Sequence, residues 1–319
     1  MSPVFALTLI VLGGALLYFG AEWMVRGAAG LARALGVKPL VVGLTLVAYG
    51  TSTPELAVSL AAIVDEGDAI VLGNVIGSCI ANLGLILGIT ALIRPPEVDG
   101  RIIRREIPIL LVSVGAVFAI LANGVIGIVD ALLLLGAALG FTIYTLSASS
   151  KEVLPTAEAI LAEAPDEDGE GKLKLAALTA FGLAVLLAGG YVFVEGSRGL
   201  ALWLGISERV VGLTVVAFGT SVPELAASIV AAARGHAALA IGNVVGSNIF
   251  NIFFVLGGVG LVSPIHGALG ELRLDLIFLV AITLFGALAM RGSRRISRVE
   301  GGLFVSAYAV FIALAIAGW

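Results

Sequence analysis

The sequence predicts an all-α integral membrane protein, with ten transmembrane helices arranged as two inverted five-helix repeats. Three observations predict this fold class. Of the 319 residues, 60% are hydrophobic and 13% are charged, which lies outside the usual composition of soluble domains. One pair of motifs occurs twice in the chain at a constant offset. The long apolar runs divide evenly between the two copies, five to each.

The apolar runs are long enough to cross a bilayer, which takes about 20 residues in a helix. The run at 107–146 is too long for one crossing, and Asn123-Gly124 is the turn predicted to divide it. The first Lys or Arg is Arg26, so the first run lacks the basic flank of a signal peptide and is expected to remain as a helix. The predicted spans are 5–33, 38–64, 70–93, 104–122, 125–147, 173–203, 207–233, 238–262, 272–290 and 300–318.

The two copies of the motifs lie 169 residues apart: 41–55 matches 210–224, and 73–82 matches 242–251. Glycines further upstream keep this offset, so the repeating unit includes all five predicted helices of each half. An odd number of spans per unit places the second copy in the membrane upside down, as in many secondary transporters. The predicted divisions are a first repeat at 1–147, a linker at 148–172 and a second repeat at 173–319, with repeat cores at about 38–93 and 207–262.

The positive charges predict the orientation. Lys and Arg gather in the loops on one side of the ten-span arrangement, and the other side has little beyond Arg198, Arg209 and Arg273. Cytoplasmic loops carry such an excess, so both termini are expected outside and the acidic linker at 148–172 in the cytoplasm. The linker lacks the ligand order of an EF-hand and is interpreted as a solvated connector. We expect a multi-pass protein of the cell membrane that functions as a monomer in the lipid bilayer, without a nucleic-acid partner.

Each half carries a Gly-Thr-Ser-X-Pro-Glu segment inside an apolar run. Proline removes a backbone donor, so each helix is predicted to kink there and to release the backbone carbonyls of Ala48 and Ala217. A carboxylate within a membrane span is costly and marks a functional site. Two carboxylates at mirror positions, each beside hydroxyl groups, predict one shared site. Its residues are Thr51, Ser52 and Glu55 in the first half and Thr220, Ser221 and Glu224 in the second.

A second motif places three polar side chains four residues apart, on one stripe of a helix. The two trios are Asn74, Ser78 and Asn82, and Asn243, Ser247 and Asn251. Asn74 and Asn243 are interpreted as residues that join helices by hydrogen bonds, and the others as candidate ligands. Carboxylate, hydroxyl, amide and carbonyl oxygens suit hard cations such as Na⁺ and Ca²⁺, whereas zinc or copper would call for nitrogen or sulfur. Two glutamates balance one Ca²⁺ or two Na⁺, and a third Na⁺ would leave one positive charge in excess.

These paired motifs resemble the alpha repeats of the sodium/calcium exchanger family, within the calcium/cation antiporter superfamily, over nearly the whole chain. The resemblance implies ten helices and alternating access, in which the first and sixth helices slide across a fixed core. It implies that Glu55 and Glu224 are the central calcium ligands, helped by Thr51 and Thr220. The sodium ligands that it implies are Ser52, Ser78, Ser221, Ser247, Ala48 and Ala217, and it places Asn82 in the lining of the pocket.

The expected function is therefore an antiporter that exchanges Na⁺ for Ca²⁺, three for one, without a cofactor. The paired Gly77-Ser78 and Gly246-Ser247 steps favour sodium, because the proton-coupled members of the superfamily resemble Gly-Asn-X-X-Glu at this motif, with glutamate at the glycine position. Asn251 stands where potassium-dependent relatives have aspartate, which disfavours potassium co-transport. An antiporter of the same fold that is coupled to H⁺ or moves another divalent cation remains the alternative. An intramembrane enzyme is disfavoured because the sequence contains no HExxH motif.

Overall fold

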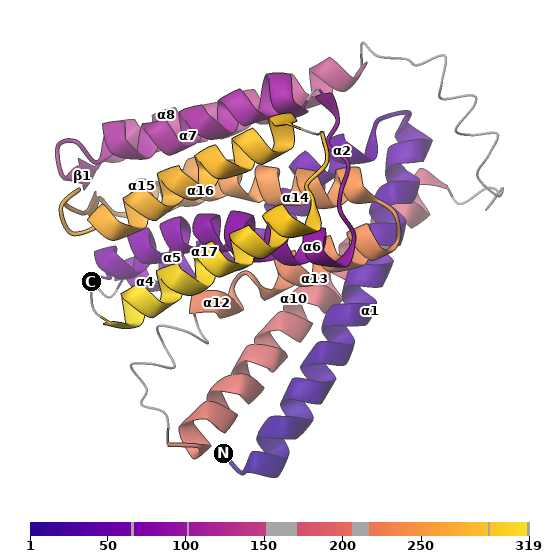
Figure 1. Cartoon of the computed structure of the whole chain (residues 1–319), viewed down its shortest axis with the longest axis horizontal. Helices are drawn as coiled ribbons and strands as arrows, with labels where there is room; N and C mark the ends of the chain where they lie inside the picture. The colour runs from indigo at the N-terminus through magenta and orange to yellow at the C-terminus, as the bar shows by residue number, and fades with distance from the viewer. Residues whose placement is uncertain (65–66, 101, 151–170, 206–216, 293, 318–319) are drawn as a thin grey trace.

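The computed structural model describes residues 1–319 except 65–66, 101, 151–170, 206–216, 293 and 318–319. The described residues are nearly all helical (Figure 1). Eight of their helices are long and apolar enough to cross a membrane. These are α1 (Pro3–Leu35), α8 (Ile128–Ser150), α10 (Lys172–Trp203), α16 (Arg273–Gly292), α17 (Arg298–Ala317) and three interrupted helices at Pro39–Val64, Asp68–Ile93 and Ala237–Val262.

Two of the ten predicted spans are not among these eight. The span predicted at 104–122 consists of a π-helical turn, η3 (Ile102–Glu106), and α7 (Ile107–Ile120). The charged residues of η3 shorten its apolar part. The span predicted at 207–233 starts in 206–216, outside the described residues, and continues as α12 (Ala217–Gly219) and α13 (Val222–Ala233). Ten spans therefore remain a prediction, as does the linker, most of which falls at 151–170 and also lies outside the described residues.

The three interrupted helices contain π-helical turns, which the sequence analysis did not predict. The first consists of α2 (Pro39–Val42), η1 (Gly43–Val47), α3 (Ala48–Thr51) and α4 (Thr53–Val64). The second consists of α5 (Asp68–Ala81), η2 (Asn82–Leu87) and α6 (Gly88–Ile93), and the third of α14 (Ala237–Phe250), η5 (Asn251–Val255) and α15 (Leu256–Val262). Asn82 and Asn251 each begin a π-helical turn, a feature that is frequent at functional sites.

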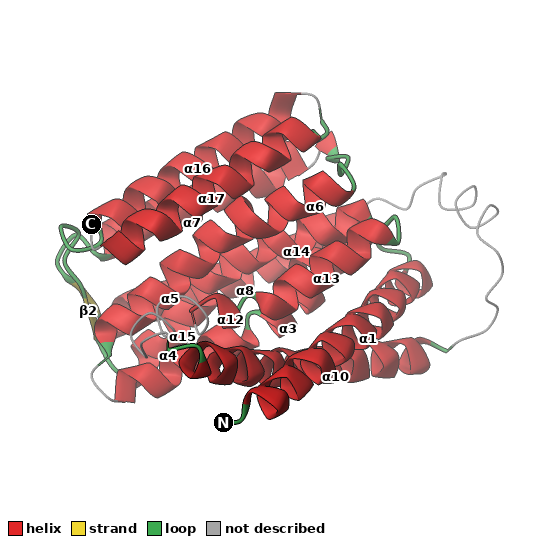
Figure 2. Cartoon of the chain, turned by 60° about the horizontal axis from the view of Figure 1, so that its bottom comes forward, coloured by secondary structure: helices red, strands yellow, loops and turns green. Residues whose placement is uncertain are grey.

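Helices α1 and α10 lie side by side along the flank of the other helices (Figures 1 and 2). Gly13 of α1 faces Phe193 of α10, and Gly27 faces Thr179, so residue numbers rise along one helix as they fall along the other. The two helices are therefore antiparallel. A Cβ on Gly27 would lie 2.7 Å from the backbone nitrogen of Thr179, so the glycines allow a close approach of the two backbones.

The turn predicted at Asn123-Gly124 is confirmed. Gly124 has a φ of 82°, in the left-handed region that favours glycine, and the side chain of Asn123 accepts a hydrogen bond from Val125 N at 3.1 Å. The next two residues form a short strand, β1 (Val125–Ile126), which pairs antiparallel with β2 (Ile265–His266). The helix predicted from residue 125 therefore begins at Ile128, because this pairing takes up the first residues.

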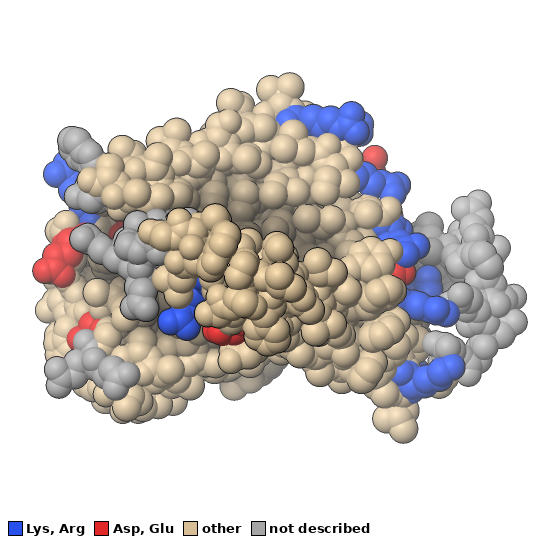
Figure 3. Space-filling view, turned by 90° about the horizontal axis from the view of Figure 1, so that it is seen from below, with Lys and Arg blue, Asp and Glu red and all other residues tan. Residues whose placement is uncertain are grey.

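On the face seen in Figure 3, Lys and Arg side chains gather along one edge of the molecule, and fewer lie elsewhere. Two basic side chains join loops and helix ends. Lys38 Nζ lies 3.5 Å from a carboxylate oxygen of Asp99, and Arg94 donates a hydrogen bond of 3.3 Å to the carbonyl of Ala233. The positive charges that the sequence analysis assigned to one side of the membrane thus gather at one end of the helices.

Candidate functional site

The two Gly-Thr-Ser-X-Pro-Glu segments interrupt their helices at serine. In the first half α3 ends at Thr51 and α4 begins at Thr53, with φ −79° and ψ 0° at Ser52 between them. In the second half α13 begins directly after Ser221, which has φ −90° and ψ 1°. The predicted kinks are confirmed, and each glutamate lies in the first turn of the helix that follows.

The predicted release of the Ala48 carbonyl is wrong. Ser52 N donates a hydrogen bond of 3.0 Å to this oxygen. The physical reason is the position of Pro54, whose missing N–H would have reached residue 50 and not residue 48. In the second half the matching N–H of Ser221 donates to Phe218 at 3.0 Å, and the release of the Ala217 carbonyl stays a prediction.

Asn74 joins the two halves of the protein. Its amide nitrogen donates to the backbone carbonyl of Glu55 at 3.0 Å and to the hydroxyl of Ser59 at 2.9 Å. Its amide oxygen accepts a hydrogen bond of 3.4 Å from the hydroxyl of Thr220, which belongs to the other half. Asn74 therefore fixes the start of the glutamate helix of its own half against the polar segment of the other.

Asn243 makes the mirror set of contacts. Its nitrogen donates to Ser228 at 3.1 Å and to the backbone carbonyl of Glu224 at 3.5 Å, and its oxygen accepts from the Thr51 hydroxyl at 3.1 Å. The interpretation of Asn74 and Asn243 as helix-joining residues is confirmed. The sequence analysis did not predict that each would connect a glutamate of one half with a threonine of the other.

Both glutamates are fully buried, with an exposed fraction of 0%. Ser221 Oγ donates across the halves to Glu55 Oε1 at 3.4 Å. The other oxygen of Glu55 and both carboxylate oxygens of Glu224 have no hydrogen-bond partner in the described part of the chain. A buried carboxylate without a partner is costly, so the arrangement favours a bound cation.

Four other predicted ligands also have a buried side-chain oxygen without a hydrogen-bond partner among the described residues. These oxygens are Ser52 Oγ, Ser78 Oγ, Asn82 Oδ1 and Asn251 Oδ1. The hydroxyl of Ser247 lies 3.4 Å from that of Thr51, and either can be the donor. Residues 1–319, apart from the gaps given above, contain no group of three or more His, Cys, Asp or Glu side chains that could hold a metal ion. The donors are mainly neutral oxygens around two carboxylates, which suits a hard cation.

Asn248 was not predicted as a site residue. It lies in α14 with an exposed fraction of 1%, and its side-chain oxygen accepts a hydrogen bond of 3.2 Å from Asn82 Nδ2. Its mirror position holds Cys79, so the repeat offers no matched pair here, and the available sequence signal was a single amide in an apolar span.

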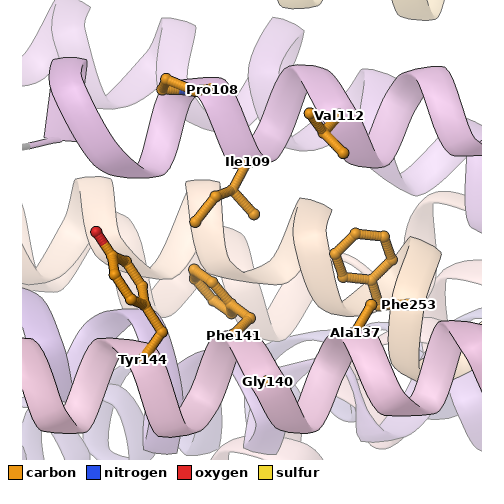
Figure 4. Close-up of a pocket in the computed structure, with 8 residues that line it drawn as sticks. All are labelled: Pro108, Ile109, Val112, Ala137, Gly140, Phe141, Tyr144 and Phe253. Carbon is orange, nitrogen blue, oxygen red and sulfur yellow. The ribbon is translucent and has the colours of Figure 1, made fainter.

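A pocket of about 370 Å³ lies away from these residues, between α7 and α8. Its lining is apolar, and Figure 4 shows Ile109 of α7 and Phe141 of α8 pointing toward one another across it. None of the predicted ligands lines it. The pocket therefore plays no part in the candidate cation site.

Comparison with known proteins finds relatives over nearly the whole chain. The family model described as "Sodium/calcium exchanger protein" matches residues 5–154 and 174–317. The chain is 34% identical to the sodium/calcium exchanger MaX1 of Methanosarcina acetivorans over 337 residues, which cover 95% of this chain and 96% of that protein. It is 33% identical to the inner membrane protein YrbG of Escherichia coli over 317 residues, 97% of this chain and 96% of that one.

A solved structure of the sodium-calcium exchanger NCX_Mj, soaked with Na⁺ and without Ca²⁺, has the same overall fold. Its TM-score with this chain is 0.84 at 34% sequence identity, and the match covers 98% of this chain and 99% of the other. The residues matched by the family model lie in both halves and include the positions of the candidate ligands.

Proposed function

Because the chain belongs to the sodium/calcium exchanger family, we propose that it is a secondary antiporter that exchanges Na⁺ for Ca²⁺ across the cell membrane. The observation that carries this proposal is the pair of buried glutamates. Each comes from one copy of the same motif, and three of their four carboxylate oxygens have no partner in the described chain. A transported cation would provide a partner for these oxygens. Its release would leave two buried negative charges, which the next bound cations would balance.

The calcium ion is proposed to bind between Glu55 and Glu224, with Thr51 and Thr220 beside it. The proposed sodium ligands are Ser52, Ser78, Ser221, Ser247 and the carbonyls of Ala48 and Ala217, with Asn82 and Asn251 completing the oxygen lining. The Ala48 carbonyl already accepts the Ser52 N–H. It could contribute only through its second lone pair.

Alternating access is proposed to occur by movement of α1 and α10 against the other helices. The two helices correspond to each other in the repeat and are antiparallel, as an inverted ten-helix arrangement requires. Their backbones approach closely at the glycines, for example where Gly27 meets Thr179, which favours movement of the two helices as one unit. The edge rich in Lys and Arg is proposed to face the cytoplasm, which would put both termini outside.

The exchange ratio is proposed to be three Na⁺ for one Ca²⁺. Two carboxylates neutralise one Ca²⁺, so a load of three Na⁺ carries one extra positive charge across the membrane. One charge per cycle gains about 2.3 kcal/mol for each 100 mV of membrane potential. That gain would help to expel calcium against its gradient.

Calcium uptake into sodium-loaded vesicles tests this function. The purified protein is reconstituted, and uptake of radioactive calcium is followed with an outward sodium gradient, without one, and with a protonophore present. Exchange predicts uptake that depends on the sodium gradient and survives the protonophore. Uptake that ignores sodium and is abolished by the protonophore would instead support H⁺ coupling. Competition by other divalent cations in the same assay would measure selectivity.

A further inference from the structure

Asn248 contacts one of the proposed ligands without being one itself. Its side-chain oxygen accepts the hydrogen bond from Asn82 Nδ2 at 3.2 Å, and its side chain is 1% exposed. The two residues come from opposite halves of the protein, since Asn82 begins η2 and Asn248 lies in α14. The contact therefore connects the two halves beside the proposed cation site.

The hydrogen bond determines which end of the Asn82 amide faces the site. An asparagine amide has a donor end and an acceptor end. Because the nitrogen of Asn82 is directed to Asn248, its oxygen must point the other way. That oxygen is buried and has no partner in the described chain, so it is available to a cation.

The mirror position lacks this arrangement. Asn248 corresponds to Cys79 in the repeat, and the Cys79 thiol lies 3.7 Å from the backbone carbonyl of Asn248. Neither the oxygen nor the nitrogen of Asn251, which corresponds to Asn82, has a hydrogen-bond partner among the described residues. The amide nitrogen of Asn82 thus has a partner across the halves, whereas neither end of the Asn251 amide has one in the described chain.

We propose that Asn248 is a positioning residue, which holds the Asn82 amide with its oxygen directed toward the transported cation. The inference rests on the proposed function in one respect, that Asn82 is a cation ligand. Asn248 is not proposed as a ligand: its oxygen accepts the hydrogen bond from Asn82, and its nitrogen is a donor without a partner in the described chain. Without Asn248 the Asn82 amide can rotate. Cation binding must then restrict this rotation, which lowers the affinity.

Calorimetric titration of the full-length protein in detergent with calcium chloride, and separately with sodium chloride, tests this role. Asn248→Ala should weaken binding of at least one of the two ions by about 3- to 10-fold, the value of one net hydrogen bond. Cys79→Ala is the matched control: it truncates the mirror side chain and removes its 3.7 Å contact with the backbone carbonyl of Asn248, while the side-chain bond between Asn248 and Asn82 is kept. It should change both affinities by less than about twofold. Asn248→Ser provides a second variant if Asn248→Ala does not fold.

A double-mutant cycle separates positioning from a general structural effect. If Asn248 acts through Asn82, the Asn82→Ala/Asn248→Ala protein should bind no more weakly than Asn82→Ala alone. Additive losses, or no loss in either Asn248 variant, would overturn the inference. Vesicle exchange by the unmodified protein is measured in parallel. If the unmodified protein exchanges the ions but the binding losses of the two substitutions are additive, only this inference is wrong. If the unmodified protein does not exchange the ions but the binding losses are non-additive, only the proposed function is wrong. A wild-type protein that binds neither ion would defeat both.

Discussion

The hydroxyl of Thr51 donates a hydrogen bond of 3.1 Å to the side-chain oxygen of Asn243. The bond joins the glutamate segment of the first half to Asn243 of the second half. Thr220 of the second half makes the equivalent bond to Asn74 of the first half, at 3.4 Å. Each asparagine then holds the start of a glutamate helix through its nitrogen. The two carboxylates are therefore set by one reciprocal network, so a change in either half is expected to disturb both.

This network predicts that Asn74→Ala destabilises the protein. The substitution removes three hydrogen bonds, to Glu55, Ser59 and Thr220. At about 0.6 kcal/mol per bond between membrane helices, the free energy of unfolding should fall by about 2 kcal/mol. Unfolding of the purified protein in detergent measures it. Ser59→Ala removes one of these bonds and should lose about a third as much; equal losses in the two variants would contradict the network.

The close contact of α1 and α10 predicts that Gly27→Ala is poorly tolerated. The added Cβ would lie 2.6 Å from Thr179 Oγ1 and 2.7 Å from its backbone nitrogen, so the two helices must move apart, at a cost of about 1–3 kcal/mol. Gly14→Ala is the control on the same helix, because its Cβ would meet nothing within 4 Å. Only Gly27→Ala should lower the unfolding temperature and slow exchange. Similar behaviour of the two variants would argue against this packing.

His236 precedes α14 at the end where Arg94 and Ala233 meet. Partial burial, and then the positive charge of Arg33, lower the pKa of His236 below its ordinary value of 6.5. The unfolded chain therefore binds the proton more readily, so stability is full above pH 6.5 and declines as the pH falls below it. Unfolding temperatures between pH 8 and pH 5 should show this decline, and His236→Gln should reduce it. An unchanged pH slope in the variant would contradict the assignment.

Three-for-one exchange predicts that voltage drives transport. In sodium-loaded vesicles each calcium entering with two charges would be matched by three charges leaving, so an inside-positive potential should accelerate uptake and an inside-negative one should slow it. Potassium gradients with valinomycin set the potential, and each 100 mV is worth about 2.3 kcal/mol per cycle. Uptake that is insensitive to the potential would indicate an electroneutral ratio of two to one.

The repeated motifs indicated the residues of the candidate site because charged and hydroxyl groups are rare and costly in apolar spans. Glu55, Ser221 and their neighbours were proposed from composition and spacing, and their role as ligands stays a prediction. The reciprocal contacts of Asn74 and Asn243 could not, because they depend on how two distant segments cross in space. The Ala48 carbonyl was misassigned for a local reason: the missing donor of Pro54 affects the carbonyl four residues earlier, at position 50.

The π-helical turns that begin at Asn82 and Asn251 also escaped prediction. Both sequences continue as apolar runs of helical character, and a single inserted residue per turn leaves no periodic signal over so short a stretch. The two-stranded pairing at Val125 and His266 was missed because two-residue strands are below the length that alternation can reveal.

The central claim is that Glu55 and Glu224 bind the exchanged cations, and sodium-driven calcium uptake by Glu55→Gln and Glu224→Gln tests it most directly. Each variant keeps the shape of the side chain and removes its charge, so uptake should fall at least about 100-fold, which corresponds to about 2.7 kcal/mol. Glu195→Gln is the matched control, because that carboxylate is 36% exposed and lies 4.0 Å from Arg198. It should exchange like the unmodified protein. Full sodium-driven uptake by both Glu55→Gln and Glu224→Gln would contradict the account.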